Sequence, residues 1–217
     1  MKVKELSRTL SSAILAGIFI SLGASAALVS PNKTVSAFIF TLGLTAILAF
    51  KVDLFTGKCG YLLSQEKKRD YLIFLCTVWL GNLIGCWLIA SGLRFYFPEA
   101  KNLFLESYSN KIEALMSSKS ITTSYTSVFC GMLMYIAVDG FKRCNENRLL
   151  GCVCYILAVA TFVICGFEHC VADMFYLILA GNTGLKSLLF LIAVTAGNFI
   201  GSTLTHLLLL WADANHR

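Results

Sequence analysis

The residues best suited to chemistry stand together in one long apolar stretch. Residues 150–180 contain the pair Glu168-His169, followed by Asp173. A glutamate–histidine pair inside a membrane-length apolar run is costly, and ionisable residues at such places are functional candidates. Away from water the charged imidazolium is disfavoured, so we expect His169 to be mostly neutral. A neutral imidazole can donate one hydrogen bond to an anion or take part in relaying a proton to it.

The nine cysteines raise the question of disulfides or a metal site. Most lie inside apolar runs, and the sequence has neither a CxxC pair nor a histidine set of zinc spacing. Cys170 stands beside His169, but a further ligand pair is missing. We therefore predict free cysteines that pack as small hydrophobic residues, with no metal and no cofactor. Phosphate-binding glycine loops, nucleophile elbows and metalloprotease helices are also absent, which argues against an enzyme.

The elements that must position these residues are long apolar segments. Of the 217 residues, 57% are hydrophobic and 14% are charged, whereas average soluble domains carry about 25% charged residues. About 20 apolar residues are needed to cross a bilayer as a helix. The sequence predicts a single all-α membrane domain over residues 1–217, with six transmembrane helices at about 12–30, 35–63, 71–95, 125–141, 150–180 and 187–211.

The second and fifth of these segments are too long for one plain crossing. Each has charged residues near its middle, namely Lys51 and Asp53 in 35–63 and the Glu168-His169 pair in 150–180. A bilayer tolerates irregular backbone only where protein buries it or where it lines a wet cavity. We therefore expect both helices to be broken and to face a central path.

The distribution of lysine and arginine predicts the orientation in the membrane. One side receives eleven of these residues and the other receives Lys33, Arg94, Lys101, Lys111, Lys119 and Lys186. The richer side is expected to be cytoplasmic and to hold both termini. The stretch Ser12–Val29 is interpreted as the first span rather than a cleaved signal segment. The net charge of +6 follows mostly from this bias and requires no nucleic-acid partner.

Two halves of the chain share a pattern. Residues 81–85 (GNLIG) resemble residues 197–201 (GNFIG), and upstream of them residues 53–55 (DLF) resemble residues 173–175 (DMF). Two copies of a three-span unit must run in opposite directions, which is a known transport architecture with its site at the interface of the copies. The GxxxG spacing also allows helices to pack closely. We predict an inverted 3+3 repeat with copies at about 12–95 and 125–211.

Four short runs resemble a known family. Residues 166–169 (GFEH) followed by 172–175 (ADMF) resemble the signature of the formate/nitrite transporter family, and 53–57 (DLFTG) and 40–44 (FTLGL) are similar to its second-span motifs. The resemblance runs through all six spans. It implies an aquaporin-like fold and a homopentamer with one pore in each subunit.

The resemblance also implies roles for individual residues. His169 is expected to be the central pore histidine, with Thr56 as its partner from the broken second helix. Glu168 is expected behind the histidine, where it fixes the loop geometry, and Lys119 is the best match to the family's lysine at the outer vestibule. The resemblance places apolar constrictions on either side of the histidine at Phe40, Leu44, Leu54 and Phe162.

One position departs from the family pattern. Four residues after the histidine the family has asparagine, and this chain has Asp173. A carboxylate close to the path repels anions unless it is paired or protonated. Lys51, in the other broken helix, is a candidate to offset that charge. The departure leaves the choice of substrate open.

The favoured function is a proton-linked channel or transporter for small monovalent acid anions in the plasma or inner membrane. Candidates implied by the resemblance are formate, nitrite, hydrosulfide, acetate and lactate. The first alternative is an aquaporin-like channel for neutral small solutes, although Asn-Pro-Ala motifs are absent. The second is a membrane redox or metal protein that uses the cysteines and His169, although paired-histidine haem spacing is missing.

Overall fold

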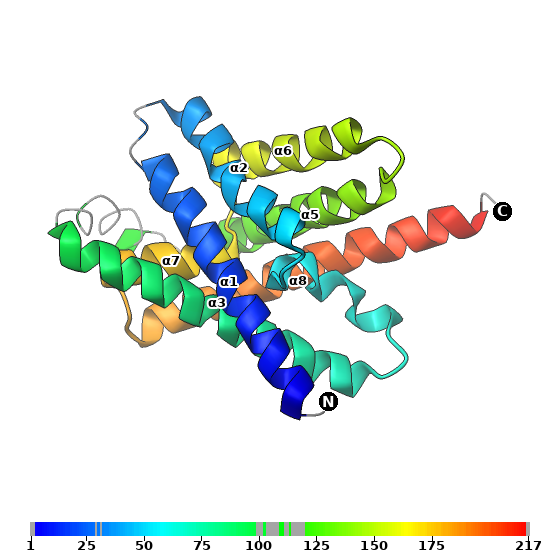
Figure 1. Ribbon diagram of the computed structural model, residues 1–217, viewed down its shortest axis with the longest axis horizontal. Helices are drawn as coiled ribbons and strands as arrows, with labels where there is room; N and C mark the ends of the chain where they lie inside the picture. Colours follow the sequence, from blue (N-terminus) through cyan, green and yellow to red (C-terminus); the bar gives the residue numbers. More distant parts are fainter. Residues whose placement is uncertain are drawn as a thin grey trace.

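The protein is built from helices (Figure 1). The computed structural model describes residues 3–28, 30, 32–98, 102, 109–110, 113 and 120–215. In chain order the elements are α1 (Val3–Leu28), α2 (Lys33–Phe50), the 3-10 helices η1 (Phe55–Gly57) and η2 (Cys59–Ser64), α3 (Lys68–Tyr96), α5 (Ser120–Arg143), α6 (Arg148–Cys165), α7 (Cys170–Ala180) and α8 (Leu185–Asn215).

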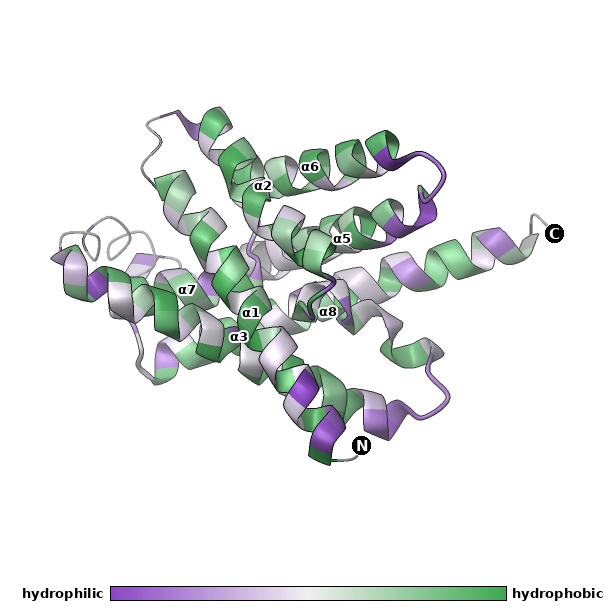
Figure 2. Cartoon of the chain, in the orientation of Figure 1, coloured by the Kyte–Doolittle hydropathy of each residue, from purple (hydrophilic) through white to green (hydrophobic). Residues whose placement is uncertain are grey.

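The long helices have the length and composition of membrane spans. Within the described ranges, five helices are long and apolar enough to cross a bilayer, namely α1, α2, α3, α6 and α8, and α7 is a shorter apolar helix. Apolar residues dominate the helices in Figure 2, whereas the turns near residues 65–67 and 144–147 are polar. Large apolar side chains face outward, such as Trp87 at 55% exposure. A lipid environment accounts for this surface, which identifies a multi-pass membrane protein.

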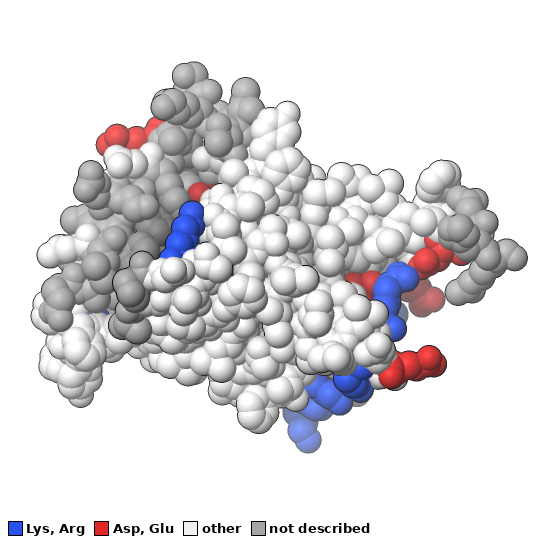
Figure 3. Space-filling model, turned by 90° about the horizontal axis from the view of Figure 1, so that it is seen from above, with Lys and Arg blue, Asp and Glu red and all other residues white. Residues whose placement is uncertain are grey.

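The distribution of charged side chains on the surface also fits a membrane protein. On the face drawn in Figure 3, a broad band has neither acidic nor basic side chains, and the coloured residues gather toward its ends. A charged side chain in the hydrocarbon core is expensive, so such a band is typical of a surface covered by lipid.

The helical path is interrupted in the two segments for which the sequence predicted a break. Helix α2 ends at Phe50, because Lys51 has a left-handed φ of 55° and the Val52 N–H bonds to the Ile47 carbonyl at 3.2 Å. Helix α6 ends in the same way at Gly166, whose φ is 70°. Both endings satisfy carbonyls of the last turn through bonds that close a Schellman motif. Residues 51–54 and 166–169 are not helical, and they lead into η1 and α7.

The two halves of the chain pack alike. Helix α1 lies along α2 and α3, and α5 lies along α6 and α8. A Cβ on Gly85 would meet the Ile14 carbonyl of α1, and a Cβ on Gly201 would meet the Val128 carbonyl of α5. Both GxxxG motifs therefore act as close-packing surfaces, as expected. The first-span glycine Gly17 does the same, since its Cβ would meet the Asn82 carbonyl.

We predict that Gly85→Ala destabilises the protein and that Gly92→Ala does not. Both glycines lie in α3, but a methyl group at Gly85 would also meet Ile18 N at 2.8 Å, and nothing lies within 4 Å of one at Gly92. Overpacking costs about 1–3 kcal/mol, whereas alanine gains about 1 kcal/mol over glycine in an open helix position. Thermal unfolding in detergent should show a lower Tm only for Gly85→Ala. Equal melting temperatures would show that the α1–α3 contact is not tight.

Candidate functional site

His169 is buried, with both ring nitrogens engaged. It is the N-cap residue of α7 and is 2% exposed. Its Nδ1 accepts a hydrogen bond from the Ala172 N–H at 3.1 Å, and its Nε2 lies 2.9 Å from Thr56 Oγ1. A neutral imidazole that accepts at Nδ1 carries its proton at Nε2. The hydrogen bonds thus assign the tautomer in which His169 donates to the Thr56 hydroxyl oxygen.

Thr56 reaches the histidine from the other interruption. It is the middle residue of η1 and is 1% exposed. A Gly57 N–H···O=C Leu54 bond of 3.1 Å closes this short turn. Because the Thr56 oxygen accepts from His169, its own hydroxyl proton points elsewhere and can be donated to a further acceptor. The structure therefore brings together the two residues that the family resemblance paired.

Two buried asparagines hold the interrupted segments in place. Asn82 of α3 accepts from the Phe55 N–H at 2.9 Å and donates to the carbonyls of Asp53 at 3.1 Å and Ala13 at 2.8 Å. The asparagine is fully buried. Its side chain thus supplies the partners that the backbone between α2 and η1 lacks. Buried backbone groups without partners are costly, so this amide is a structural requirement of the interruption.

Asn198 of α8 does the same for the second interruption. Its Oδ1 accepts from the Cys170 N–H at 2.9 Å, and its Nδ2 donates to the carbonyls of Glu168 and Ser127, both at 2.8 Å. These contacts match the position of Asp53 with Glu168. The sequence analysis paired residues 53–55 with residues 173–175 because their letters match. The asparagines instead bind the backbone of residues 53 and 55 in one half and of residues 168 and 170 in the other, so that alignment was wrong.

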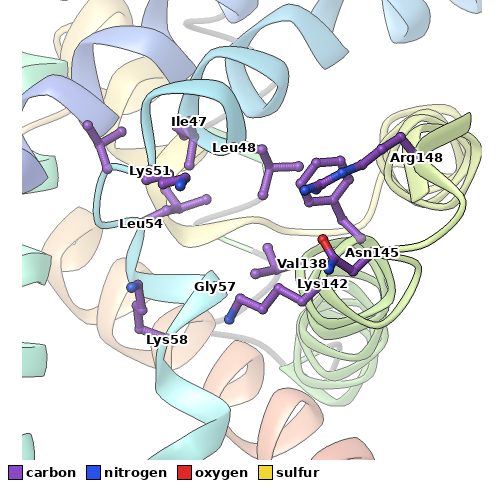
Figure 4. A pocket seen from close by; sticks show the side chains of 12 residues that line it. Ile47, Leu48, Lys51, Leu54, Gly57, Lys58, Val138, Lys142, Asn145 and Arg148 are labelled. Carbon is purple, nitrogen blue, oxygen red and sulfur yellow. The ribbon is translucent and has the colours of Figure 1, made fainter.

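Aromatic and aliphatic side chains enclose the histidine. The Phe162 ring stacks on the His169 ring with centroids 5.4 Å apart, and Phe40 meets Phe162 edge to face at 5.7 Å. Leu44 and Leu54 are each 1% exposed. Leu54 lines a cavity of about 370 Å³, together with Gly57 and Val138 (Figure 4). Phe162 thus packs on the histidine, and Leu54, two residues before Thr56, lines the cavity.

The carboxylates expected near the site are buried beside the histidine, whereas Lys51 lies apart from them in the cavity wall. Glu168 is 6% exposed and Asp173 is 2% exposed, and the Asp173 N–H bonds to the His169 carbonyl at 2.8 Å. Lys51 lies in the wall of the 370 Å³ cavity, whereas Asp173 is buried in the first turn of α7. Lys119 lies outside the described residues.

A polar cluster between η2, α5 and α8 was not foreseen. The Tyr61 hydroxyl donates to Asp139 at 2.7 Å, and Arg143 joins Asp139 at 2.7 Å and Asp213 at 3.0 Å. His206 is held by Ser64 and Tyr135, at 2.7 and 2.8 Å. Asp139 and Arg143 are four residues apart, which was the available signal. The cluster ties η2 to the ends of two helices, and His206 is satisfied by side chains.

The cysteines show no sign of a metal centre. All nine are free thiols, and Cys170 is fully buried beside the histidine. Within the described ranges, no three histidine, cysteine or acidic side chains come together as a metal site.

The chain is similar to proteins of one family. A family model described as formate/nitrite transporter matches residues 2–212. A formate-nitrite transporter of Entamoeba histolytica is 26% identical over 223 residues, which cover 93% of this chain and 62% of that protein. A probable formate transporter of Methanothermobacter thermautotrophicus is 27% identical over 205 residues, covering 82% and 74%. This chain thus spans less than two thirds of the length of the Entamoeba relative.

Solved structures show the same fold. A pentameric formate channel with formate bound superposes with a TM-score of 0.80 at 21% identity, and the match covers 99% of both chains. An ion channel of the FNT family superposes with a TM-score of 0.76 at 18% identity, covering 96% of this chain and 89% of the other.

We predict that Asn198→Leu destabilises the protein strongly. Leucine fills a similar volume but leaves the Cys170 N–H and the Glu168 carbonyl of the interruption without the partner that Asn198 supplies, at a cost of about 1–3 kcal/mol for each buried group. Thermal unfolding in detergent should give a clearly lower Tm than wild type. Asn145→Leu, in the exposed turn after α5, is the matched control and should melt like wild type. Equal melting of the two variants would contradict the structural role of Asn198.

Proposed function

Because the chain belongs to the formate/nitrite transporter family, we propose that it is a channel or transporter for small monovalent acid anions, linked to protons through His169. Family membership makes it a transport protein and confirms the prediction that it is not an enzyme. The observation that carries the proposal is the 2.9 Å contact between His169 and Thr56, enclosed by apolar side chains.

The proposed architecture has six transmembrane helices in an aquaporin-like inverted 3+3 repeat, in which α2 with η1 and η2 forms one broken span and α6 with α7 forms the other. The matching bonds of Asn82 and Asn198 support the repeat, since each ties an interruption to the first and third helix of its own half. Sites of such transporters lie where the two copies meet. Thr56 and His169 meet across that interface.

The apolar walls pose a problem for an anion that a proton solves. Phe40 and Phe162 on one side and Leu44 and Leu54 on the other are the proposed constrictions, and each is at most 3% exposed. An ion that enters such a surrounding loses its hydration without compensation, at a cost of many kcal/mol. The neutral acid lacks this penalty. The proposed path therefore favours a substrate that is protonated between the constrictions.

The geometry at His169 suits proton transfer. The Nε2 proton points toward Thr56, and the Thr56 hydroxyl proton can be donated onward, so an anion bound beside Thr56 accepts one hydrogen bond from a hydroxyl that is itself polarised by the imidazole. Proton movement along this line starts from an imidazolium, which forms when Nδ1 takes a proton from water and gives up its bond to the Ala172 N–H. The Nε2 proton then passes to Thr56 Oγ1 and the Thr56 proton passes to the anion, which leaves a neutral ring. Between transfers the Ala172 N–H fixes the neutral ring through Nδ1.

Glu168 and Asp173 are proposed to tune this site. Glu168 stands behind the histidine, where its carbonyl is held by Asn198 at 2.8 Å. Asp173 lies one turn into α7 and brings a carboxyl group next to the proposed path. Its charge is proposed to shape which anion is preferred, and the rank order of formate, nitrite and hydrosulfide fluxes in Asp173→Asn, compared with wild type, is the relevant measurement.

Formate heads the proposed substrates, followed by nitrite and hydrosulfide and then acetate and lactate. The relatives include a probable formate transporter, and the similar solved channel has formate bound. Formate is also among the smallest of these acids, which suits a path closed by two phenylalanine rings.

We also propose a homopentamer, as in the similar formate channel. An apolar groove of about 710 Å³ runs between α3 and α8 and is lined by Leu72, Trp79, Ile192 and Phe199 among others. An outward-facing apolar groove of this size suits a helix of a neighbouring subunit. The plasma or inner membrane with cytoplasmic termini is the proposed location, from the lysine and arginine bias, and Lys119 is the proposed vestibule lysine on the outer side.

The sharpest test measures anion flux through a variant that keeps the N-cap of α7 but lacks the titratable imidazole of His169. In His169→Asn, the amide oxygen can still accept from the Ala172 N–H, since asparagine is a favoured N-cap residue, but it cannot titrate. We expect uptake of formate, nitrite or hydrosulfide into proteoliposomes to be faster at mildly acidic than at neutral pH in wild type. The variant should lose that pH dependence and fall by about tenfold or more.

His206→Asn is the matched control, because His206 is also buried but lies away from Thr56. It should keep the pH dependence of wild type, and the Tm of each variant reports whether the fold is intact. If a folded His169→Asn still takes up the anion faster at mildly acidic pH, the histidine has no part in the mechanism. Water or glycerol flow without anion uptake would favour the channel for neutral solutes.

A further inference from the structure

The cavity beside Leu54 is surrounded by positive charge. It has a volume of about 370 Å³ and lies between the end of α2, η1, the end of α5 and the start of α6. Figure 4 shows basic side chains from each of these segments around it, and we call the space lined by Lys51, Lys58, Lys142 and Arg148 the basic cavity. None of the described residues that line it carries a carboxylate.

The positive charge is only partly compensated. Lys58 pairs with Asp53 at 2.9 Å. Lys142 donates to the Tyr61 hydroxyl at 3.3 Å and lies 4.8 Å from the centre of that ring, and Arg148 lies 5.6 Å from the centre of the Phe141 ring. Neither a hydroxyl nor a ring neutralises a cation. Among the described residues Lys58 is the one of these four cations with an ion pair, so positive charge remains in excess, and clefts lined by one sign of charge concentrate counter-ions.

Two of the cations occupy positions that do not favour them. Lys51 has a left-handed φ, and α6 has Gly166 at the equivalent place, where glycine is the usual residue. A side chain in that conformation costs about 1–2 kcal/mol. Arg148 is the first residue of α6, at the positive end of the helix dipole. Neither the backbone of α2 nor the dipole of α6 favours a cation at these positions, and an anion held between the two side chains would stabilise both cations.

The size of the basic cavity indicates a ligand larger than the proposed substrates. Ligand sites of small molecules have volumes of about 300–1,000 Å³, and a three- or four-atom monovalent anion needs only a small part of such a space. Arginine and lysine together are the usual partners of phosphate groups, because the guanidinium binds two oxygens and the ammonium acts as a point charge. The amino end of α6 adds partial positive charge toward the same anion.

We propose that the basic cavity binds a small multivalent anion with phosphate groups, of about the size of pyrophosphate, and that this anion blocks conduction. The proposal rests on the proposed function, because the block requires that the path begins at this cavity. The ligand cannot follow the substrate past Leu54, since a multivalent ion loses far more hydration than a monovalent one and a single proton does not neutralise it. Occupancy of the cavity therefore closes the mouth of the path.

Inorganic pyrophosphate is the probe, and two measurements are made on the same preparations. The first is formate uptake into proteoliposomes with pyrophosphate on both sides, at ionic strength matched with chloride. The second is the Tm in detergent as pyrophosphate is added, which reports binding independently of transport. We expect pyrophosphate to slow uptake by wild type and to raise its Tm.

The test variant is Lys51→Gly combined with Arg148→Gln. It removes two cations, and glycine relieves the left-handed position, so the variant should fold at least as well as wild type. Losing these contacts should raise the pyrophosphate concentration for half block by about tenfold or more. Lys67→Gln, which removes a cation of the same end that does not line the cavity, should behave like wild type.

The outcomes separate this proposal from the proposed function. Block and a Tm shift that are weakened only in the cavity variant would support the site. Normal formate uptake with no effect of pyrophosphate, or equal block in all three proteins, would overturn it. A Tm shift that the cavity variant loses, in a wild type that transports no formate, would support the binding site and contradict the proposed transport.

Discussion

The rest of the structure depends on how two interrupted helices satisfy their backbone inside a bilayer. Lipid offers no hydrogen bonds, so each interruption needs an internal partner. Asn82 and Asn198 provide it, and each also bonds to the first helix of its half, through the Ala13 and Ser127 carbonyls. Close helix contact at glycine, as at Gly85 and Gly201, is what allows α3 and α8 to bring these amides within reach. The interruptions exist only because this packing exists.

The interruptions in turn place the chemistry. They bring Thr56 and His169, 113 positions apart in sequence, to 2.9 Å, and this polar pair lies between apolar side chains. The Ala172 N–H assigns the acceptor role to Nδ1, so the exchangeable proton faces Thr56. An apolar barrier with one polar pair inside it disfavours a bare anion and favours its acid. The basic cavity is proposed to precede that barrier, where its positive charge would attract anions, most strongly those of higher charge.

Much of this could be predicted from residue types and spacing. Long apolar runs predict helices, charges inside two of them predict interruptions, and the GxxxG spacing predicts close packing. The sequence could not show which residues of the two halves correspond. The asparagines bind backbone N–H and C=O groups, and every residue type carries a C=O, so residue types give no signal for these positions. For that reason the asparagine contacts pair Asp53 with Glu168, and not with Asp173, in the proposed repeat. The basic cavity and the Tyr61–Asp139 contact were also beyond reach, since they join segments whose spacing in sequence carries no signal.

The central claim is that a proton travels with the anion. It is tested most directly by following the pH inside proteoliposomes, with a trapped dye, while labelled formate is taken up through the wild-type protein and protein-free vesicles supply the background. The account predicts that the lumen acidifies in proportion to the formate gained, and that a membrane potential leaves the rate unchanged. Formate uptake that carries current, responds to the potential and leaves the lumenal pH constant would contradict it.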